Sequence, residues 1–146
     1  MQLLMVAVRD YLRTSSDITA ILPAGAAGVI AAGDLTSETQ TPALLLDNLG
    51  DGLNPLSSSV QTVRLLLSAV DRGRGYLHIE QLLHYARELV NNSANALDYL
   101  TFPPGYLTVV SIRAPATAGA GARPRRVSIE RSLYIVVEVS GLTVSD

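Results

Sequence analysis

The sequence predicts an α+β domain in which helices pack on one face of a mostly antiparallel β-sheet. Three observations indicate this class. Residues 60–71 carry apolar side chains at alternating positions, which is typical of a β-strand. Residues 79–90 repeat apolar side chains with the period of a helix, whereas residues 127–139 alternate again. Because strands and helices do not alternate regularly along the chain, a parallel sheet of β-α-β units is not expected.

The composition predicts a single domain over residues 1–146 with an unusually apolar surface. Hydrophobic residues make up 48% of the chain and charged residues only 16%, compared with about 25% charged residues in an average soluble domain. A surface with so few charges is expected either to contact other protein subunits or to belong to an unusually apolar monomer.

Several classes of protein are disfavoured by what the sequence lacks. The formal net charge is −2, so no overall field attracts nucleic acid or an acidic membrane. All eleven cationic residues are arginine, and a P-loop needs a lysine. No cysteine is present, which removes disulfides and thiolate metal sites. Because Arg9 and Asp10 interrupt the apolar N-terminus, we expect no signal peptide and a soluble protein made in the cytoplasm.

The N-terminal part of the chain is predicted to contain two helices and two strands. Apolar spacing predicts a first helix over residues 2–13 and a short helix over residues 18–22, capped by residues 15–17. A short strand is expected over residues 29–32. A strand over residues 42–48 begins with proline, which favours a sheet edge or the first position of a strand. The buried stripe of the first helix is predicted to be Leu3, Leu4, Ala7, Val8, Tyr11 and Leu12.

The strand at 60–71 and the helix at 79–90 are predicted to form the centre of the fold. The strand is apolar on much of both faces, which indicates a central position in the sheet. The helix is expected to be the main cover of that sheet. Its stripe comprises Ile79, Leu82, Leu83, Ala86, Leu89 and Val90. Glycines at 73 and 75 allow the sharp turn between them, and an anion site at this turn is a weaker alternative to solvated arginines.

The C-terminal part is predicted to form a short helix and a long hairpin. Residues 91–93 end the helical periodicity, and residues 94–102 read as a further helical segment. Residues 106–113 and 125–139 form the two arms of the hairpin. Between them, residues 114–124 are rich in alanine and glycine and are expected to form a flexible loop. One face of the last strand carries Val127, Ile129, Leu133, Ile135, Val137 and Val139, interrupted by Arg131.

No motif in the sequence predicts catalysis, a cofactor or a metal. Glu80, His84 and Glu88 lie on one helical stripe at i, i+4 and i+8, which favours solvated helix pairs over a metal site. A hydrolase that uses Glu80 and His84 is the enzyme alternative. A small-ligand-binding domain with its cavity under residues 76–90 is a third alternative.

The order of elements resembles the tail terminator (tail completion) proteins of long-tailed bacteriophages, a family of head-tail connector proteins. The resemblance covers residues 3–13, 17–22, 42–46, 60–71, 79–90 and 131–138. It implies a structural virion protein of the tail or neck, which forms a homo-oligomeric ring, a hexamer in the family. Such a ring ends polymerisation of the tail tube and offers a docking surface to the head-side connector. DNA would pass through the ring without sequence-specific binding.

The resemblance leaves a stopper or adaptor of the neck as the alternative role. The candidate contacts with subunits and partners are arginines. A cluster of arginines favours a contact with protein over a contact with DNA. The alternative is a charged strand edge that discourages unwanted pairing. The candidate arginines are Arg72, Arg74, Arg123, Arg125, Arg126 and Arg131. Exposed strand edges and the loop at 114–124 are expected to contribute to the same contacts.

Overall fold

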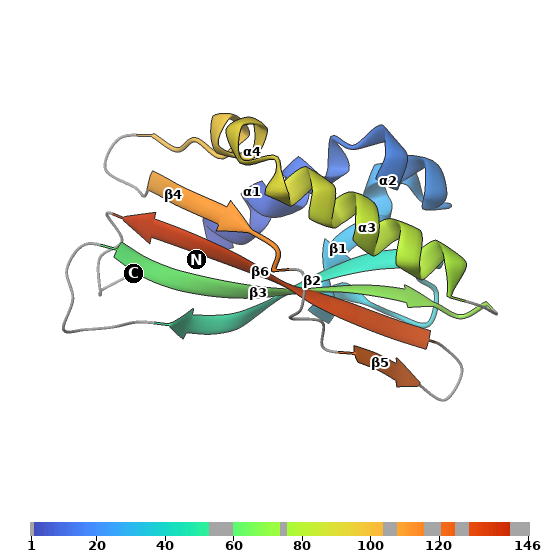
Figure 1. The fold of residues 1–146 in the computed structure, drawn as a ribbon. Helices are drawn as coiled ribbons and strands as arrows, with labels where there is room; N and C mark the ends of the chain where they lie inside the picture. The colour runs from blue at the N-terminus through green and yellow to red at the C-terminus, as the bar shows by residue number, and fades with distance from the viewer. Residues whose placement is uncertain are drawn as a thin grey trace.

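The fold is one β-sheet covered on one face by a layer of helices (Figure 1). The computed structural model describes residues 2–52, 60–73, 76–103, 108–115, 121–124 and 129–140. The elements in chain order are α1 (Gln2–Arg13), α2 (Ser16–Ile21), η1 (Gly25–Gly28), β1 (Val29–Ala31), η2 (Ala32–Asp34), β2 (Ala43–Gly52), β3 (Val60–Asp71), α3 (Leu77–Asn91), α4 (Ser93–Tyr99), β4 (Thr108–Arg113), β5 (Gly121–Pro124) and β6 (Ile129–Ser140). The predicted α+β class is confirmed.

The sheet has the strand order β1-β2-β3-β6-β4, and β5 also pairs with β6. Every pair is antiparallel except β1 with β2. Strand β3 lies at the centre, as its apolar faces predict, and β4 and β6 form the predicted antiparallel pair. Strands β4 and β5 share the outer edge of β6, since β4 pairs with residues 136–140 and β5 with residues 129–132.

The proline-led strand does not lie at the edge of the sheet. Pro42 immediately precedes the first residue of β2, so its missing N–H removes no hydrogen bond from the strand ladder. Strand β1 takes the edge because it pairs in parallel with β2. Pro42 therefore lies one residue before the predicted first position of the strand, and the predicted edge position is wrong.

The helical layer divides the sheet between its two longest helices. Helix α1 contacts β1 and β2, whereas α3 contacts β3, β4 and β6 (Figure 1). On α3 the predicted stripe is buried except for Leu89, which is partly exposed. On α1 the prediction is wrong at Leu3, which is 44% exposed. The buried face of α1 is formed by Leu4, Val8, Tyr11 and Leu12.

Burial on the other face of the sheet is uneven. The first half of β3 alternates between buried and more exposed residues, but residues 67–71 are all buried. Ser68 points away from the helices, because its neighbours Leu67 and Ala69 belong to the main core. Its hydroxyl lies 2.7 Å from that of Ser132, which is directly opposite in β6. The two buried hydroxyls therefore satisfy each other across the central strand pair.

The segment predicted as a flexible loop, 114–124, makes defined contacts at both of its ends. Ala114 is 2% exposed, and its backbone is bound by Asn91, whose side chain accepts from the Ala114 N–H at 2.8 Å and donates to its carbonyl at 3.1 Å. At the other end, Gly121–Pro124 forms β5. Strand β6 extends beyond β4, so β5 can add to the edge that β4 leaves open. Residues 116–120 lie outside the described residues.

Helices α2, α3 and α4 form near their predicted positions, but some of their ends differ from the predicted residues. Ser15 caps α2, since its hydroxyl accepts a hydrogen bond from the N–H of Ile18 at 3.2 Å. Helix α3 ends at Asn91, within the predicted break. Helix α4 ends at Tyr99, three residues earlier than the sequence predicts.

Candidate interaction surface

Arg72, the first of the candidate interface arginines, holds a loop in place. Its guanidinium donates to the backbone carbonyls of Thr39 and Thr36, each at 2.6 Å. These bonds attach the loop before β2 to the end of β3. Because carbonyl oxygens carry no net charge, the positive charge of Arg72 has no ion-pair partner among the described residues.

Arg131 lies at the same end of the central strands. It is in register with Ala69, two residues before the end of β3. Its guanidinium forms an ion pair with Glu80 of α3 and lies over the ring of Tyr76, with 5.0 Å between Cζ and the ring centroid. The side chain thus joins β6 to the first turn of α3 and orients the Tyr76 ring.

Among the candidates whose side chains the structure describes, Arg72 and Arg131 lie at the same end of the β3–β6 pair and bind different partners. Arg123 lies in β5, where its backbone is in register with Glu130 of β6. Arg74, Arg125 and Arg126 lie outside the described residues. The candidates for which the structure describes side chains therefore mark one place, the junction between β3, β6 and the start of α3.

The polar stripe of α3 forms helix and strand pairs, as the spacing predicts. His84 Nε2 lies 3.3 Å from Glu88 Oε1, one turn away, whereas Glu80 binds Arg131. Glu80 and His84 thus have different partners, an arrangement that gives no support to a hydrolytic pair. Within the described part of the chain, no group of three His, Asp or Glu residues could hold a metal ion.

The space beneath α3 is filled by the core. Four of its inward side chains are fully buried and belong to one cluster with β3, β4 and β6; they are Ile79, Leu82, Ala86 and Val90. Three hollows lined by described residues lie elsewhere, beside α1 and around the end of α4. A ligand cavity beneath α3 is not supported by this packing.

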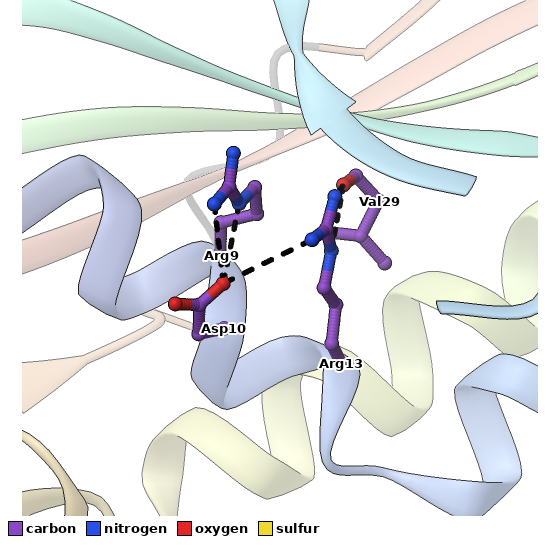
Figure 2. Close-up of polar contacts among 4 residues, drawn as sticks. All are labelled: Arg9, Asp10, Arg13 and Val29. Carbon is purple, nitrogen blue, oxygen red and sulfur yellow. Dashed lines mark hydrogen bonds and ion pairs between the residues drawn. The ribbon is translucent and has the colours of Figure 1, made fainter. Parts of the chain in front are cut away.

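A polar cluster on α1 attaches this helix to the edge of the sheet (Figure 2). Arg13 donates from Nε and Nη2 to the carbonyl of Val29, at 3.1 and 2.7 Å. Asp10 lies between two cations, with its Oδ1 3.9 Å from Arg13 Nη1 and accepting from Arg9 at 3.3 Å. We call these residues the α1 clamp. Its only sequence signal is the i, i+3 spacing of Asp10 and Arg13.

Two strands at the outer edges of the sheet, β1 and β4, have features that disfavour the addition of another strand. At β1, which has three residues, both donors of Arg13 occupy the Val29 carbonyl. At β4 the register shifts between Val109 and Ser111, which leaves Val110 as a bulge that bends the edge. Bulges, charges and short strands are common protections of sheet edges. These features disfavour strand addition at β1 and β4, and the expectation that exposed strand edges make subunit contacts stays a prediction.

An apolar ridge on α1 is the surface that the sequence analysis missed. Leu3 is 44% exposed and Val6 is 36% exposed, and hollows flank them on both sides. The hollow beside α4 has a volume of about 390 Å³ and is lined by Leu3, Val6, Ala7, Asp10, Thr101, Phe102 and Pro103. The hollow beside β1 has a volume of about 260 Å³ and is lined by Met5, Val6, Arg9, Ala31, Asp34 and Leu46.

Val6 stands between the two hollows and lines both. We call Leu3, Val6 and the two hollows the α1 ridge. Apolar side chains gathered on a convex helix between apolar hollows are typical of a protein contact. A signal for it was present in the sequence, because Met5 and Val6 lie outside the stripe that α1 needs to cover the sheet.

Comparisons with known proteins identify a fold rather than a family. No protein-family model and no curated protein matches the sequence. Among the described residues, no helix is both long enough and apolar enough to cross a membrane. The structure is similar to a chain of the solved structure "Virion of native gene transfer agent (GTA) particle", with a TM-score of 0.65 and 16% identity. Because the match covers 94% of this chain and 95% of the other, the two share essentially the whole fold.

Proposed function

We propose that this protein is a structural component of a phage-like virion. The observation that carries the proposal is the likeness over nearly the full length of both chains to a component of a gene transfer agent virion. The apolar α1 ridge supports it, because an assembly subunit needs a surface for side-chain packing.

Within that class, the role that we propose is a tail terminator. The elements on which the sequence resemblance depends are present in the fold, in the same order, from α1 to β6. The protein would form a ring on the end of the tail tube, stop its polymerisation and receive the head-side connector. Its contacts would be other copies of itself, the tube protein and that connector, and it would act without catalysis.

Ring formation is tested by native mass spectrometry and negative-stain microscopy of the purified protein, with and without polymerised tube protein. We expect a ring of defined stoichiometry, stabilised by tube ends, and shorter tubes when the protein is present during polymerisation. A protein that stays monomeric at high concentration and leaves the tube length unchanged would contradict the terminator role.

A stopper or adaptor of the neck is the second candidate, since the likeness to a virion component does not depend on position in the particle. The two roles differ in their first partner. A terminator binds tube ends without the head-side connector, whereas a stopper or adaptor binds the connector and does not bind free tubes. A pull-down with each partner separately distinguishes them.

A further inference from the structure

Arg87 of α3 carries a positive charge that has no partner among the described residues. Its side chain is partly buried, and its Nε is buried without a hydrogen bond. The Nε of Arg131 is also buried without a hydrogen bond, but the charge of Arg131 is balanced by Glu80. Buried polar atoms in native proteins nearly always have a hydrogen-bond partner, so an exception that also carries an unbalanced charge requires an explanation.

The position of Arg87 follows from its neighbours along the helix. Seven residues earlier, Glu80 binds Arg131 of β6. Four residues later, Asn91 binds the backbone of Ala114, directly after β4. Because side chains four and seven residues apart share one side of a helix, Arg87 lies on the same flank of α3, between these two contacts.

The outer edge of β6 has an unpaired interval on this side of the sheet. Strand β5 pairs with β6 as far as Ser132, and β4 pairs with it from Val136 onward, so residues 133–135 pair with neither strand. Figure 1 shows β4 and β5 separated along β6. The interval from Ser132 to Val136 spans about 13 Å of strand. This length suits a side chain on a loop better than a further strand.

The charges in this part of the molecule favour an acidic partner. Residues 108–140, which contain β4, β5 and β6, include five arginines and two glutamates. The rest of the chain includes six arginines and eleven acidic residues. The two acids of α3 do not balance the charge of Arg87, because Glu80 binds Arg131 and Glu88 lies beside His84. A carboxylate from outside the chain therefore supplies what this flank of α3 lacks.

We infer that Arg87 is a docking point for an acidic side chain on a protruding loop of another protein. The planar guanidinium matches a carboxylate, whose two oxygens can accept from its two terminal nitrogens. A nucleic acid fits less well, because its many phosphates also meet the excess of negative charge in the rest of the chain. The inference goes beyond the proposed function, since this contact does not require a ring.

Arg87→Met tests the contact with little disturbance of the fold. Methionine is a good helix former and keeps an apolar stem in place of the buried Nε, which has no partner to lose. We therefore expect urea titrations to give a free energy of unfolding no lower than that of the wild type.

Arg64→Met is the matched control. Arg64 is exposed on β3 and has no ion-pair partner among the described residues. It points away from the helices, because its neighbours Val63 and Leu65 belong to the core. The control therefore removes the same charge from a different face of the sheet.

The probe is an acetylated peptide of alternating glutamate and serine, compared with the same peptide in which glutamine replaces glutamate. Binding is followed by heteronuclear NMR at low salt, where charge attraction is least screened. We expect the glutamate peptide to shift the Nε–H signal of Arg87 and the glutamine peptide to leave it unchanged. Arg87→Met should weaken binding of the glutamate peptide about tenfold, and Arg64→Met should bind it as the wild type does.

Equal affinity of Arg87→Met and the wild type, or equal binding of the two peptides, would overturn the inference. An equal loss in Arg64→Met would also overturn it, because the attraction would then be general. A DNA duplex that displaces the peptide from Arg87 would assign the site to phosphates instead. A shift of the Arg87 signal on dilution of the protein alone would assign it to a second copy and exclude a separate partner. None of these results depends on ring formation, so the proposed function is tested separately.

Discussion

At the scale of single residues, Arg13 connects α1 to the edge strand β1. It donates two hydrogen bonds to Val29 at the start of β1 and lies beside the carboxylate of Asp10 (Figure 2). Replacing it by methionine keeps much of the apolar stem but leaves the Val29 carbonyl without these donors. Since a hydrogen bond to a charged group contributes about 1.5–3 kcal/mol, we expect Arg13→Met to lower the free energy of unfolding by about 2 kcal/mol in urea titrations.

Arg9→Met is the matched control for Arg13. Arg9 contacts only its neighbour Asp10 in the described structure, and its side chain is 30% exposed. Exposed ion pairs contribute about 0–1 kcal/mol, so this change should cost less than that of Arg13. Equal losses in the two variants would show that the bonds to Val29 do not stabilise the fold.

Tyr11 gives a pH-dependent test of the packing between α1 and α3. Its hydroxyl donates to the Leu89 carbonyl at 2.8 Å and accepts from Asn95 at 3.1 Å. Burial raises the pKa of Tyr11 above its ordinary value of 10.0, and the bond from Asn95 acts in the opposite direction. The native state therefore holds this proton more tightly than the unfolded chain does. The resulting stability is complete below about pH 10 and is lost as the pH rises through the folded pKa.

We expect Tyr11→Phe to lower the free energy of unfolding by about 1–2 kcal/mol at neutral pH. The difference from the wild type should shrink as the pH rises above about 10, because the wild type alone loses the Tyr11 linkage. Urea titrations of both proteins across this range measure the difference. Tyr99→Phe serves as a control, since Tyr99 is 45% exposed. A difference that stays constant with pH would contradict the burial effect.

At the scale of elements, the spacing of apolar residues correctly predicted those helices and strands whose apolar faces are buried in the core. The stripe of α3 and the apolar faces of β3 and β6 were predicted because these residues meet the core. The prediction failed where another element decides the outcome. Three outcomes depend on tertiary partners, which the local sequence does not encode. They are the exposure of Leu3, the inner position of β2 beside β1, and the addition of β5 to β6.

Asn91 shows how one side chain can define the end of a strand. It binds both backbone groups of Ala114, one residue after β4, in the manner of a neighbouring strand. Asn91→Ala would leave both groups without these partners in a buried position, and we expect a loss of about 2 kcal/mol. Hydrogen exchange of the Ala114 amide should accelerate more than that of amides in β3. Unchanged exchange at Ala114 would contradict this role, and Asn92→Ala, at an exposed neighbouring position, is the control.

At the scale of the whole molecule, the sequence predicted the class and the central strand but not the surfaces. Arg72 and Arg131 were named as contacts, and their described bonds are within the chain, where they hold the loop before β2 and the Tyr76 ring. The α1 ridge was absent from the prediction although Val6 lies outside the stripe of α1, because the pattern does not say whether such a residue stays exposed, and Leu3 lies within the stripe.

A ring that forms only from folded subunits makes the melting temperature depend on concentration. Each tenfold rise in protein concentration should raise the melting temperature by roughly 2–4 °C, because association stabilises the native state by mass action. Differential scanning calorimetry over a dilution series measures this slope. A slope of zero in the wild type would contradict association in the native state.

The pairing of β3 with β6 also sets the order of events during synthesis. Ser68 and Ser132 lie opposite each other in the sheet but are 64 residues apart in the chain. A ladder between such distant segments forms slowly and only after the later segment exists. On the ribosome, α1 to α4 therefore emerge before the strand that completes the sheet. The sheet is completed only once β6 has been synthesised, and with it the side chain of Arg131 that orients Tyr76.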